Sequence, residues 1–273
     1  MSDEQIRLDA LLVLKGFVSG REKAKELIEN GAVTVAGKTV IKASVKVPFD
    51  SEIACDTTSV RFVSRGGFKL EKALAVSGAA VQGAVAMDVG ASTGGFTDCL
   101  LQAGAKMVYA IDVGTDQLHP TLRADERVVV LENTDVRSER LHEIVDKNSV
   151  DICAIDVSFI SLTRVLPAVV PFLKDGATVL CLIKPQFEAG KSAIGKKGVV
   201  RDAKVHRRVL EDLCIFFNET AFSVKTLDFS PVTGGEGNIE FLAVLTYTET
   251  KSLAPLPVSI KDVVETAHRT LKR

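Results

Sequence analysis

The chain has 273 residues, of which 46% are hydrophobic and 25% are charged, and its net charge is −1. This composition is ample for a packed core and ordinary for a soluble protein, and the length allows one large domain or a medium one beside a small one. No apolar run approaches the roughly 18 residues of a membrane span, and the polar start, Met-Ser-Asp-Glu-Gln, lacks the pattern of a signal peptide. We therefore expect a soluble, cytoplasmic protein.

The cysteines favour the same compartment. None of them pairs as Cys-x-x-Cys, and most stand inside apolar runs. The five are Cys55, Cys99, Cys153, Cys181 and Cys214. This pattern is typical of buried free thiols in a reducing cytosol rather than of a disulfide framework or a zinc site, so we predict no metal site.

Charge is distributed unevenly along the chain. Residues 15–46 contain seven Lys/Arg and three Glu (+4), residues 184–208 contain eight Lys/Arg and two acids (+6), and residues 88–156 contain six Lys/Arg and thirteen acids (−7). Basic segments that flank an acidic centre suggest an anionic polymer at the flanks and a cationic or hydroxyl-rich cofactor in the middle. Solvated faces with no partner are the alternative for any one segment.

The first 60 residues form a small unit of their own. The elements expected there are a helix over 6–17, a helix from Ser19 to Asn30-Gly31, a hairpin over 33–41 and a strand over 53–55. Ser19 stands three residues before Glu22, which is the spacing of a capping box. The exposed face of the second helix carries three cations, Arg21, Lys23 and Lys25.

This unit resembles the S-four-type RNA-binding module. The matching strings are Arg7-Leu8-Asp9 with Leu12, Arg21-Glu22-Lys23-Ala24 with Leu27-Ile28, and Gly31-x-Val33-x-Val35-x-Gly37-Lys38, with Gly20 as a departure where the family often has Ser. The resemblance implies RNA contact through backbone and shape more than through base reading. A small structural cap is the alternative. The RNA-binding residues that we predict, with later basic positions included, are Arg7, Arg21, Lys23, Lys25, Lys38, Arg65, Lys191, Lys196 and Lys197.

Residues 61–67 are predicted to link this first domain (1–60) to a second one (68–273). Gly66-Gly67 is expected to break the chain, and a helix then runs from Phe68 to Gly78. Lys69 lies on the first turn of that helix, where a cation opposes the helix dipole. We interpret this unfavourable placement as a hint of function, although most first-turn lysines are merely solvated.

The second domain is organised around residues 84–97. An apolar strand, Val85–Val89, runs into a loop of small residues, Gly90–Gly95, and then into a helix. This is how a doubly wound α/β domain begins. The spacing Gly-x-x-x-Gly-Gly is neither that of a dinucleotide fingerprint nor that of a P-loop. A turn that binds no ligand is the alternative.

Acidic side chains follow the next three apolar runs. Asp112 follows Met107–Ile111, Asp135 follows 128–131, and Asp156 closes 150–155. Sheets of this kind bind ligands at the carboxyl edge, with an acid about 20 residues after the glycine loop on the ribose hydroxyls. A single acid of this kind could be a helix cap. The glycine loop and the three acids together place a polar group or a turn after each of four successive strands, which favours an adenosine-type ligand.

The remaining pattern completes the sheet. Further elements are expected as helices near 141–145, 162–173, 202–220 and 260–271, strands over 177–183, 223–229 and up to 246, and a basic loop over 189–200. The last two strands are joined by a turn rather than by a helix. We therefore predict an α/β fold with a Rossmann-like class I methyltransferase sheet of seven strands, the last one antiparallel.

Four charged residues are expected at the same edge of this sheet. They are Lys69, Asp156, Lys184 and Glu240. Two cations and two carboxylates at one place could hold a hydroxyl group and lower its pKa, or supply a lysine that takes its proton. A surface ion-pair cluster is the alternative.

Strings spread over nearly the whole chain resemble the hemolysin-A-type (TlyA) family, which joins an S-four-type module to an FtsJ-like methyltransferase domain. They are Arg61 to Leu70, Asp88 to Asp98, Asp156 to Ser161, Lys184-Pro185-Gln186-Phe187-Glu188 and Gly234 to Glu240. The resemblance implies a ribose 2′-O-methyltransferase that uses S-adenosyl-L-methionine on a cytidine of rRNA in ribosomal subunits, 23S rRNA first, with 16S rRNA left open. It implies the catalytic tetrad Lys69, Asp156, Lys184 and Glu240. The implied cofactor residues are Asp88, Gly90, Ala91, Ser92, Thr93, Gly94, Gly95, Phe96, Asp112, Asp135 and Asp156.

Three other functions compete with this one. The family name suggests a membrane-lytic protein, which the absent signal peptide and spanning segment argue against. An RNA-binding protein with an idle site and a nicotinamide oxidoreductase are the others, the last disfavoured by the spacing of the glycine loop. We expect a monomer or a weak dimer that does not bind membranes.

Overall fold

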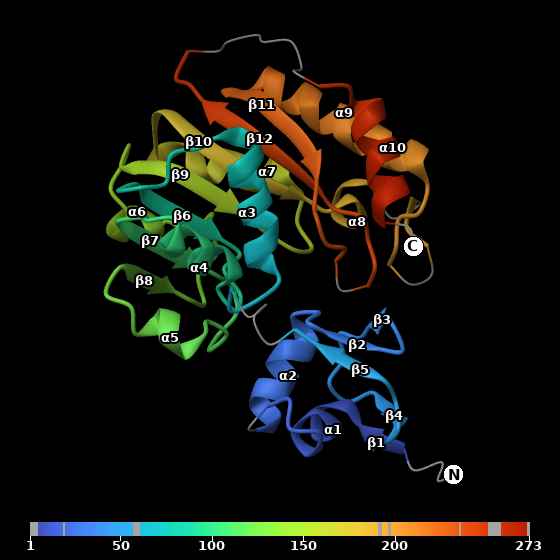
Figure 1. The fold of residues 1–273 in the computed structure, drawn as a ribbon. Coiled ribbons are helices and arrows are strands. Elements are labelled where there is room, and N and C mark those ends of the chain that lie inside the picture. The colour runs from blue at the N-terminus through green and yellow to red at the C-terminus, as the bar shows by residue number, and fades with distance from the viewer. Residues whose placement is uncertain are drawn as a thin grey trace. The chain divides into compact units, whose positions relative to one another are not determined.

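The computed structural model describes residues 5–18, 20–56, 61–190, 193–195, 198–234, 236–250 and 258–271 (Figure 1). The chain forms two compact units, residues 1–65 and residues 66–273. Each unit has its own buried apolar cluster, so each is described by itself.

The first unit contains short helices and two small sheets. Its elements are β1 (Gln5–Arg7), α1 (Leu8–Leu14), α2 (Arg21–Glu29), β2 (Val33–Val35), β3 (Lys38–Thr39), β4 (Lys46–Pro48) and β5 (Ile53–Cys55). The predicted hairpin is confirmed, because β2 pairs antiparallel with β3, and the predicted strand β5 lies on the other side of β2. The second sheet, β1 with β4, was not predicted, since residues 6 and 7 were assigned to the helix that follows them.

Helices α1 and α2 pack through fully buried leucine and isoleucine side chains. These are Leu8, Leu11, Leu12, Leu27 and Ile28. The N-cap of α2 is Gly20, which makes no side-chain hydrogen bond. The capping-box spacing predicts Ser19 as the N-cap, and that prediction is wrong. Ser19 itself lies outside the described residues. The helix ends at Glu29 with Asn30 as its C-cap, as the Asn-Gly pair predicted.

The second unit is built on a seven-stranded sheet. Its strands are β6 (Val85–Val89), β7 (Met107–Ile111), β8 (Val128–Leu131), β9 (Val150–Ile155), β10 (Leu173–Ile183), β11 (Phe222–Phe229) and β12 (Phe241–Tyr247). The order across the sheet is β11-β12-β10-β9-β6-β7-β8. Strands β6 to β10 pair parallel, whereas β12 is antiparallel to both of its neighbours. The predicted sheet, with its antiparallel last strand, is confirmed.

The helices of this unit lie on both faces of the sheet. They are α3 (Gly66–Ser77), α4 (Gly95–Gln102), α5 (Pro120–Arg123), α6 (Leu141–Ile144), α7 (Leu162–Val169), the 3-10 turn η1 (Val170–Phe172), α8 (Pro185–Glu188), α9 (Ala203–Glu219) and α10 (Ile260–Leu271). Helix α3 begins at Gly66, two residues before the predicted start. The predicted break at Gly66-Gly67 is therefore wrong, because both glycines belong to the first turn of the helix.

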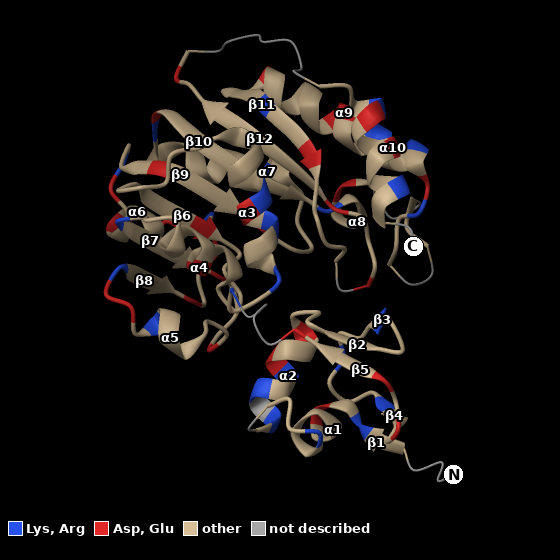
Figure 2. Cartoon of the chain, in the orientation of Figure 1, with Lys and Arg blue, Asp and Glu red and all other residues tan. Residues whose placement is uncertain are grey.

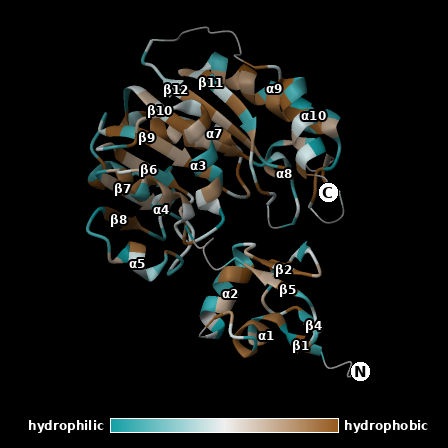
Figure 3. Ribbon diagram, viewed as in Figure 1, coloured by the Kyte–Doolittle hydropathy of each residue, from teal (hydrophilic) through white to brown (hydrophobic). Residues whose placement is uncertain are grey.

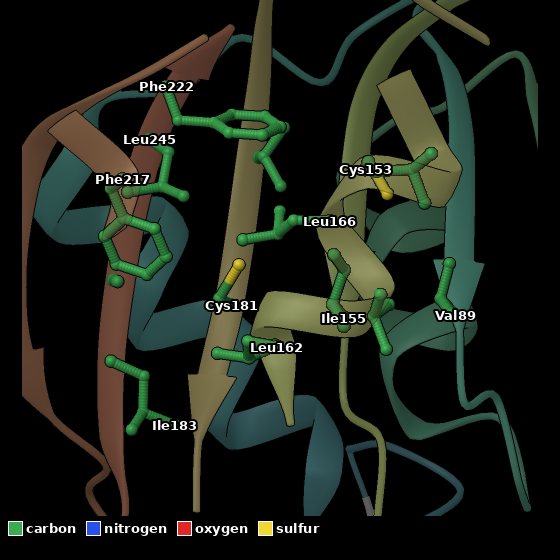
Figure 4. Packing of buried hydrophobic residues seen from close by; sticks show 14 of the residues in the cluster. Val89, Cys153, Ile155, Leu162, Leu166, Cys181, Ile183, Phe217, Phe222 and Leu245 are labelled. Atoms are coloured by element: carbon green, nitrogen blue, oxygen red, sulfur yellow. The ribbon is translucent and has the colours of Figure 1, made fainter. Parts of the chain in front are cut away.

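One continuous apolar cluster joins the sheet to α6, α7, α9 and α10. In Figure 4, Leu162 and Leu166 of α7 point toward Ile155 and Cys181 of the sheet. Figure 3 shows the matching hydropathy, with the central strands coloured hydrophobic. Helices α3 and α4 contribute no side chain to this cluster and cover the opposite face. Within the described ranges, no helix combines the length and the apolar character that crossing a membrane requires.

Candidate active site

The predicted site residues meet at the carboxyl edge of the sheet because of strand register. Val89 of β6 lies opposite Ile155 of β9, so Gly90 and Asp156 leave the sheet side by side. On the other side of β9, Ile183 of β10 lies opposite Phe241 of β12. Because β12 runs antiparallel, the residue that precedes it, Glu240, stands at the same edge as the residue that follows β10, Lys184.

Lys69 and Glu240 form a buried ion pair. The Lys69 Nζ atom donates to Glu240 Oε2 at 2.6 Å, and the two side chains are 11% and 3% exposed. Helix α3 supplies the lysine and the chain before β12 supplies the acid. Burial of both partners is expensive unless it is offset by geometry, so the pair is weak evidence for a gain in stability.

Lys184 makes a second pair a short distance away. Its Nζ atom lies 2.5 Å from Asp156 Oδ1, with the two side chains 12% and 20% exposed, and it also donates to Ser158 Oγ at 3.0 Å. Lys184 therefore does not extend into solvent, as a lysine at a strand end usually does. It is held against the chain that follows β9.

The two pairs act on one another electrostatically. Burial raises the pKa of Glu240, and the nearby Lys69 opposes that rise. Asp156 raises the same pKa further, and Lys184 lowers it. The four predicted tetrad residues thus form one charge cluster within the second unit, with alternating signs.

The glycine loop has the backbone that the sequence predicted. Gly90 has a φ of +88°, and a Cβ on it would stand 2.5 Å from the carbonyl oxygen of Asp156. Gly94 has a φ of +94°, and a Cβ there would meet Leu122 at 2.3 Å. Both positions therefore require glycine. Between them Ser92 and Thr93 are exposed, while Ala91, Gly95 and Phe96 are buried under the turn.

Three carboxylates of the loop region influence one another. Asp88 is fully buried and accepts a hydrogen bond from Thr97 Oγ1 at 2.6 Å. Burial raises the pKa of Asp88 to about 7, with Asp156 and Asp112 adding to the rise. The carboxyl of Asp88 is therefore partly protonated near neutral pH, and its second oxygen has no hydrogen-bond partner in the described part of the chain.

Asp112 and Asp135 lie beside this loop in different environments. Asp112 accepts from the backbone amides of Ser92 at 2.8 Å and Gly114 at 2.7 Å, so it fixes the mouth of the glycine loop. Asp135 is held by Arg137 through two side-chain hydrogen bonds of 2.9 and 2.5 Å. A ligand that uses Asp135 therefore has to share it with that guanidinium group.

Apart from Arg65, the predicted RNA-binding residues of the first unit are exposed, and two of them share a partner. Arg7 donates to both oxygens of Asp9 at 3.0 and 2.7 Å, and Arg21 donates to Asp9 at 3.0 Å. Asp9 is buried, and the Arg7 guanidinium, more than any other group, lowers its pKa to about 2. Figure 2 shows the cations along α2.

The other predicted RNA-binding positions differ in their exposure. Lys23 and Lys38 are exposed, Lys25 is 3.9 Å from Glu29, and Arg65 is half-buried. Lys191, Lys196 and Lys197 lie outside the described residues.

The sequence reasoning did not assign a role to Phe159. This side chain is 91% exposed, its backbone has a φ of +65°, and its ring centroid lies 4.9 Å from that of Phe187. A bulky residue in the left-handed region is strained, and an exposed aromatic ring three residues after Asp156 is unusual for a surface. The signal was an aromatic residue between two serines, Ser158 and Ser161, directly after a predicted strand.

Comparison with protein families gives two matches. Residues 62–247 match the family described as FtsJ-like methyltransferase, and residues 6–53 match the S4 domain.

Similar proteins align over nearly the whole chain. The chain is 46% identical to YqxC of Bacillus subtilis, over 100% of this chain and 97% of that protein. It is 39% identical to the 16S/23S rRNA (cytidine-2′-O)-methyltransferase TlyA of Mycobacterium tuberculosis, over 97% of each chain, and 38% identical to the Hemolysin A of Brachyspira hyodysenteriae, over 87% and 98%. A solved structure from Streptococcus thermophilus superposes with a TM-score of 0.77 at 45% identity, covering 99% and 98% of the two chains.

Proposed function

We propose that this chain, which belongs to the FtsJ-like methyltransferase family and carries an S4 domain, is an rRNA methyltransferase that modifies the ribose 2′-oxygen of a cytidine. The Mycobacterium tuberculosis relative and a Campylobacter jejuni relative at 35% identity are both named as rRNA (cytidine-2′-O)-methyltransferases. The buried charge cluster at the sheet edge fits the same chemistry, since a sugar hydroxyl reacts faster when its proton is removed or its developing charge is stabilised.

S-adenosyl-L-methionine is the cofactor that the glycine loop and its acids fit. When bound, it supplies a methyl group on a positively charged sulfonium, which is a good leaving group. Asp112 would hold the ribose hydroxyls and Asp135 the adenine amine, while Asp156 favours the positive charge. The absence of a Cβ at Gly90 and Gly94 allows the turn to pack against the Asp156 backbone and Leu122, which sets the shape of the loop.

Lys184 would act on the 2′-hydroxyl group. Held by Asp156 and Ser158, its ammonium form would stabilise the negative charge that develops on the 2′-oxygen, whereas its neutral form, after loss of one proton, would accept the hydroxyl proton. Alignment of this kind contributes up to about 7–11 kcal/mol in well-oriented reactions.

Lys69, Glu240 and Phe159 would position the nucleotide. The Lys69–Glu240 pair offers one donor group and one acceptor group to the target ribose. The exposed ring of Phe159 offers a surface on which a base can stack. In the first unit, Arg7 and Arg21 would contact phosphates, which position RNA without reading its sequence.

The observation that carries the proposal is the arrangement of two ion pairs beside a glycine turn. The test is incubation of the purified protein with labelled S-adenosyl-L-methionine and ribosomal subunits that lack the modification. We expect a labelled 2′-O-methylcytidine in digested rRNA, and loss of that label for Lys184→Ala at nearly unchanged RNA affinity.

A matched control is Lys147→Ala, which removes an exposed lysine of the same unit and should leave the rate unchanged. Binding of RNA without any label would favour the binding-only alternative. Release of a dye from liposomes by the purified protein would instead favour the membrane-lytic one. Substantial turnover by Lys184→Ala would remove that lysine from the role given to it here.

A further inference from the structure

Glu188 occupies an unusual place for a carboxylate. It is the last residue of the short helix α8, four positions after Lys184. Its Oε2 atom accepts from Ser161 Oγ at 2.6 Å and its Oε1 atom accepts from the backbone amide of Leu162 at 2.9 Å. No lysine or arginine in the described part of the chain forms an ion pair with it.

These two hydrogen bonds join the two segments that carry the proposed reaction. The first segment runs from Asp156 to Ser161, the N-cap of α7. The second runs from Lys184 to Glu188. Lys184 reaches the start of the first segment through Asp156 and Ser158, and Glu188 reaches its end.

The result is a closed ring of contacts with three links. The lysine contacts form the first link, the Phe159–Phe187 ring contact forms the second, and the Glu188 hydrogen bonds form the third. The strand register sets only where the two segments leave the sheet, at β9 and β10. Beyond the sheet the spacing depends on these links, and the aromatic link is held by a strained residue.

We propose that Glu188 is a positioning residue, which fixes the distance between the two segments and thereby holds the Lys184 amine against Asp156 and Ser158. This inference rests on the proposed function for its kinetic consequence. Burial raises the pKa of Glu188 while Ser161 and Leu162 lower it. The carboxylate is therefore kept in place by directional donors rather than by a counter-ion, which suits a role in geometry.

Three variants separate positioning from stability. Glu188→Ala removes both acceptors. Glu188→Gln keeps an oxygen for the Leu162 amide and adds an amide that can donate to Ser161 Oγ, so it should preserve the spacing. Glu143→Ala removes an exposed glutamate of α6 that has no part in the site, and it serves as the matched control.

The kinetic measurement is the single-turnover methylation rate with saturating cofactor and rRNA. We expect Glu188→Ala to lower the rate about 10–100-fold, the usual effect of a misplacement near 1 Å, while KM for the cofactor and the thermal unfolding temperature stay close to the wild type. Glu188→Gln should recover the rate to within about threefold, because neutral hydrogen bonds replace charged ones. A wild-type rate in Glu188→Ala would overturn the proposal. Equal damage in both variants, with weaker cofactor binding and a lower unfolding temperature, would also overturn it and assign Glu188 to stability alone.

A second measurement does not depend on activity. Limited acetylation followed by mass spectrometry reports how accessible each lysine amine is. We expect Lys184 to be modified severalfold faster in Glu188→Ala than in the wild type or in Glu143→Ala. If the wild-type protein fails to methylate rRNA, the proposed function fails, but the labelling still tests whether Glu188 positions Lys184. An unchanged reactivity of Lys184 in Glu188→Ala would overturn the positioning role.

Discussion

The two units use the same kind of contact, a carboxylate paired with a cation, in opposite ways. In the first unit the carboxylate of Asp9 is buried while Arg7 and Arg21 are 45% and 58% exposed. In the two pairs of the candidate site in the second unit, Lys69–Glu240 and Lys184–Asp156, both partners are largely removed from water, with exposures between 3% and 20%. The first arrangement leaves its cations accessible, which suits the proposed contact with a large anion, and the second keeps its charges away from water, which suits the proposed reaction of a small group.

This difference predicts how each unit responds to mutation. Exposed cations interact with phosphates through a screened field, so each one changes affinity modestly and in a salt-dependent manner. Buried pairs interact in a medium of low dielectric, where removal of one partner leaves an uncompensated charge. The second unit should therefore lose activity and stability steeply, and the first should lose affinity gradually.

The largest effect is expected at the Lys69–Glu240 pair. Glu240→Ala should lower the methylation rate at least about 100-fold and destabilise the fold by about 3–5 kcal/mol, because the Lys69 ammonium remains buried without its partner. Chemical denaturation measures the second effect and a methylation assay measures the first.

The double variant Lys69→Met, Glu240→Leu separates the two effects. Apolar replacement of a buried pair is often neutral for stability, so this variant should regain the lost stability and remain inactive. Recovery of methylation in the double variant would mean that the pair is structural, and the contrast between the two units would then disappear.

The next effect is expected at the glycine loop. Gly90→Ala adds a Cβ that would stand 2.5 Å from the Asp156 carbonyl oxygen, in addition to the strain of a positive φ. We expect a destabilisation of about 3 kcal/mol or more and cofactor binding at least about tenfold weaker, measured by calorimetry. Gly83→Ala is the matched control, because Gly83 has a φ of +76° with no atom within 4 Å of the added Cβ. Equal losses in both variants would attribute the effect to backbone strain and leave the loop without a role in binding.

The buried Asp88 predicts a pH dependence for the second unit. Its pKa is raised from 3.8 to about 7, so the folded state holds a proton that the unfolded state has already lost. The contribution of Asp88 to the free energy of unfolding is fully present below about pH 4 and is lost as the pH rises to about 7. The total loss is limited to about 4 kcal/mol, because each pKa unit corresponds to about 1.4 kcal/mol. In Asp88→Asn, whose amide oxygen still accepts from Thr97, unfolding free energy should change less over this range. Parallel curves for the two proteins would contradict the assignment.

The sequence located the strands of the second unit well and the contacts between them poorly. Apolar runs such as Val85–Val89 end where the strand ends, because burial on both faces demands continuous apolar character. The three-residue strand β1 carries no such pattern and was missed. The start of α3 was misplaced because glycine was treated as a break.

The tetrad illustrates the same limit. Its four residues were assigned to one edge, but the partition into Lys69–Glu240 and Lys184–Asp156 depends on the register of β10 with β12 and on a contact between residues 171 positions apart. No local pattern encodes such a distance. The positive φ of Phe159 could not be predicted from the sequence either, because no local residue pattern indicates that a phenylalanine adopts the left-handed conformation.

The smallest effect is expected at Asp9, where the direction of the change in rRNA affinity distinguishes two models of binding. Asp9→Asn removes a negative charge, so a protein that bound RNA by net charge alone would bind more tightly. If Asp9 instead holds Arg7 and Arg21 in place, the variant should bind rRNA about two- to fivefold more weakly, because hydrogen bonds to an ionised acceptor are about twice as strong as neutral ones.

The rate at saturating RNA should stay unchanged, since the second unit is intact. Arg21→Ala should weaken binding and reduce the slope of log affinity against log salt by about one, whereas Lys46→Ala, an exposed cation of the same unit, removes the same charge without touching Asp9. A comparable loss in Lys46→Ala, together with tighter binding by Asp9→Asn, would show that the first unit acts as a diffuse positive surface rather than through an ordered arginine pair.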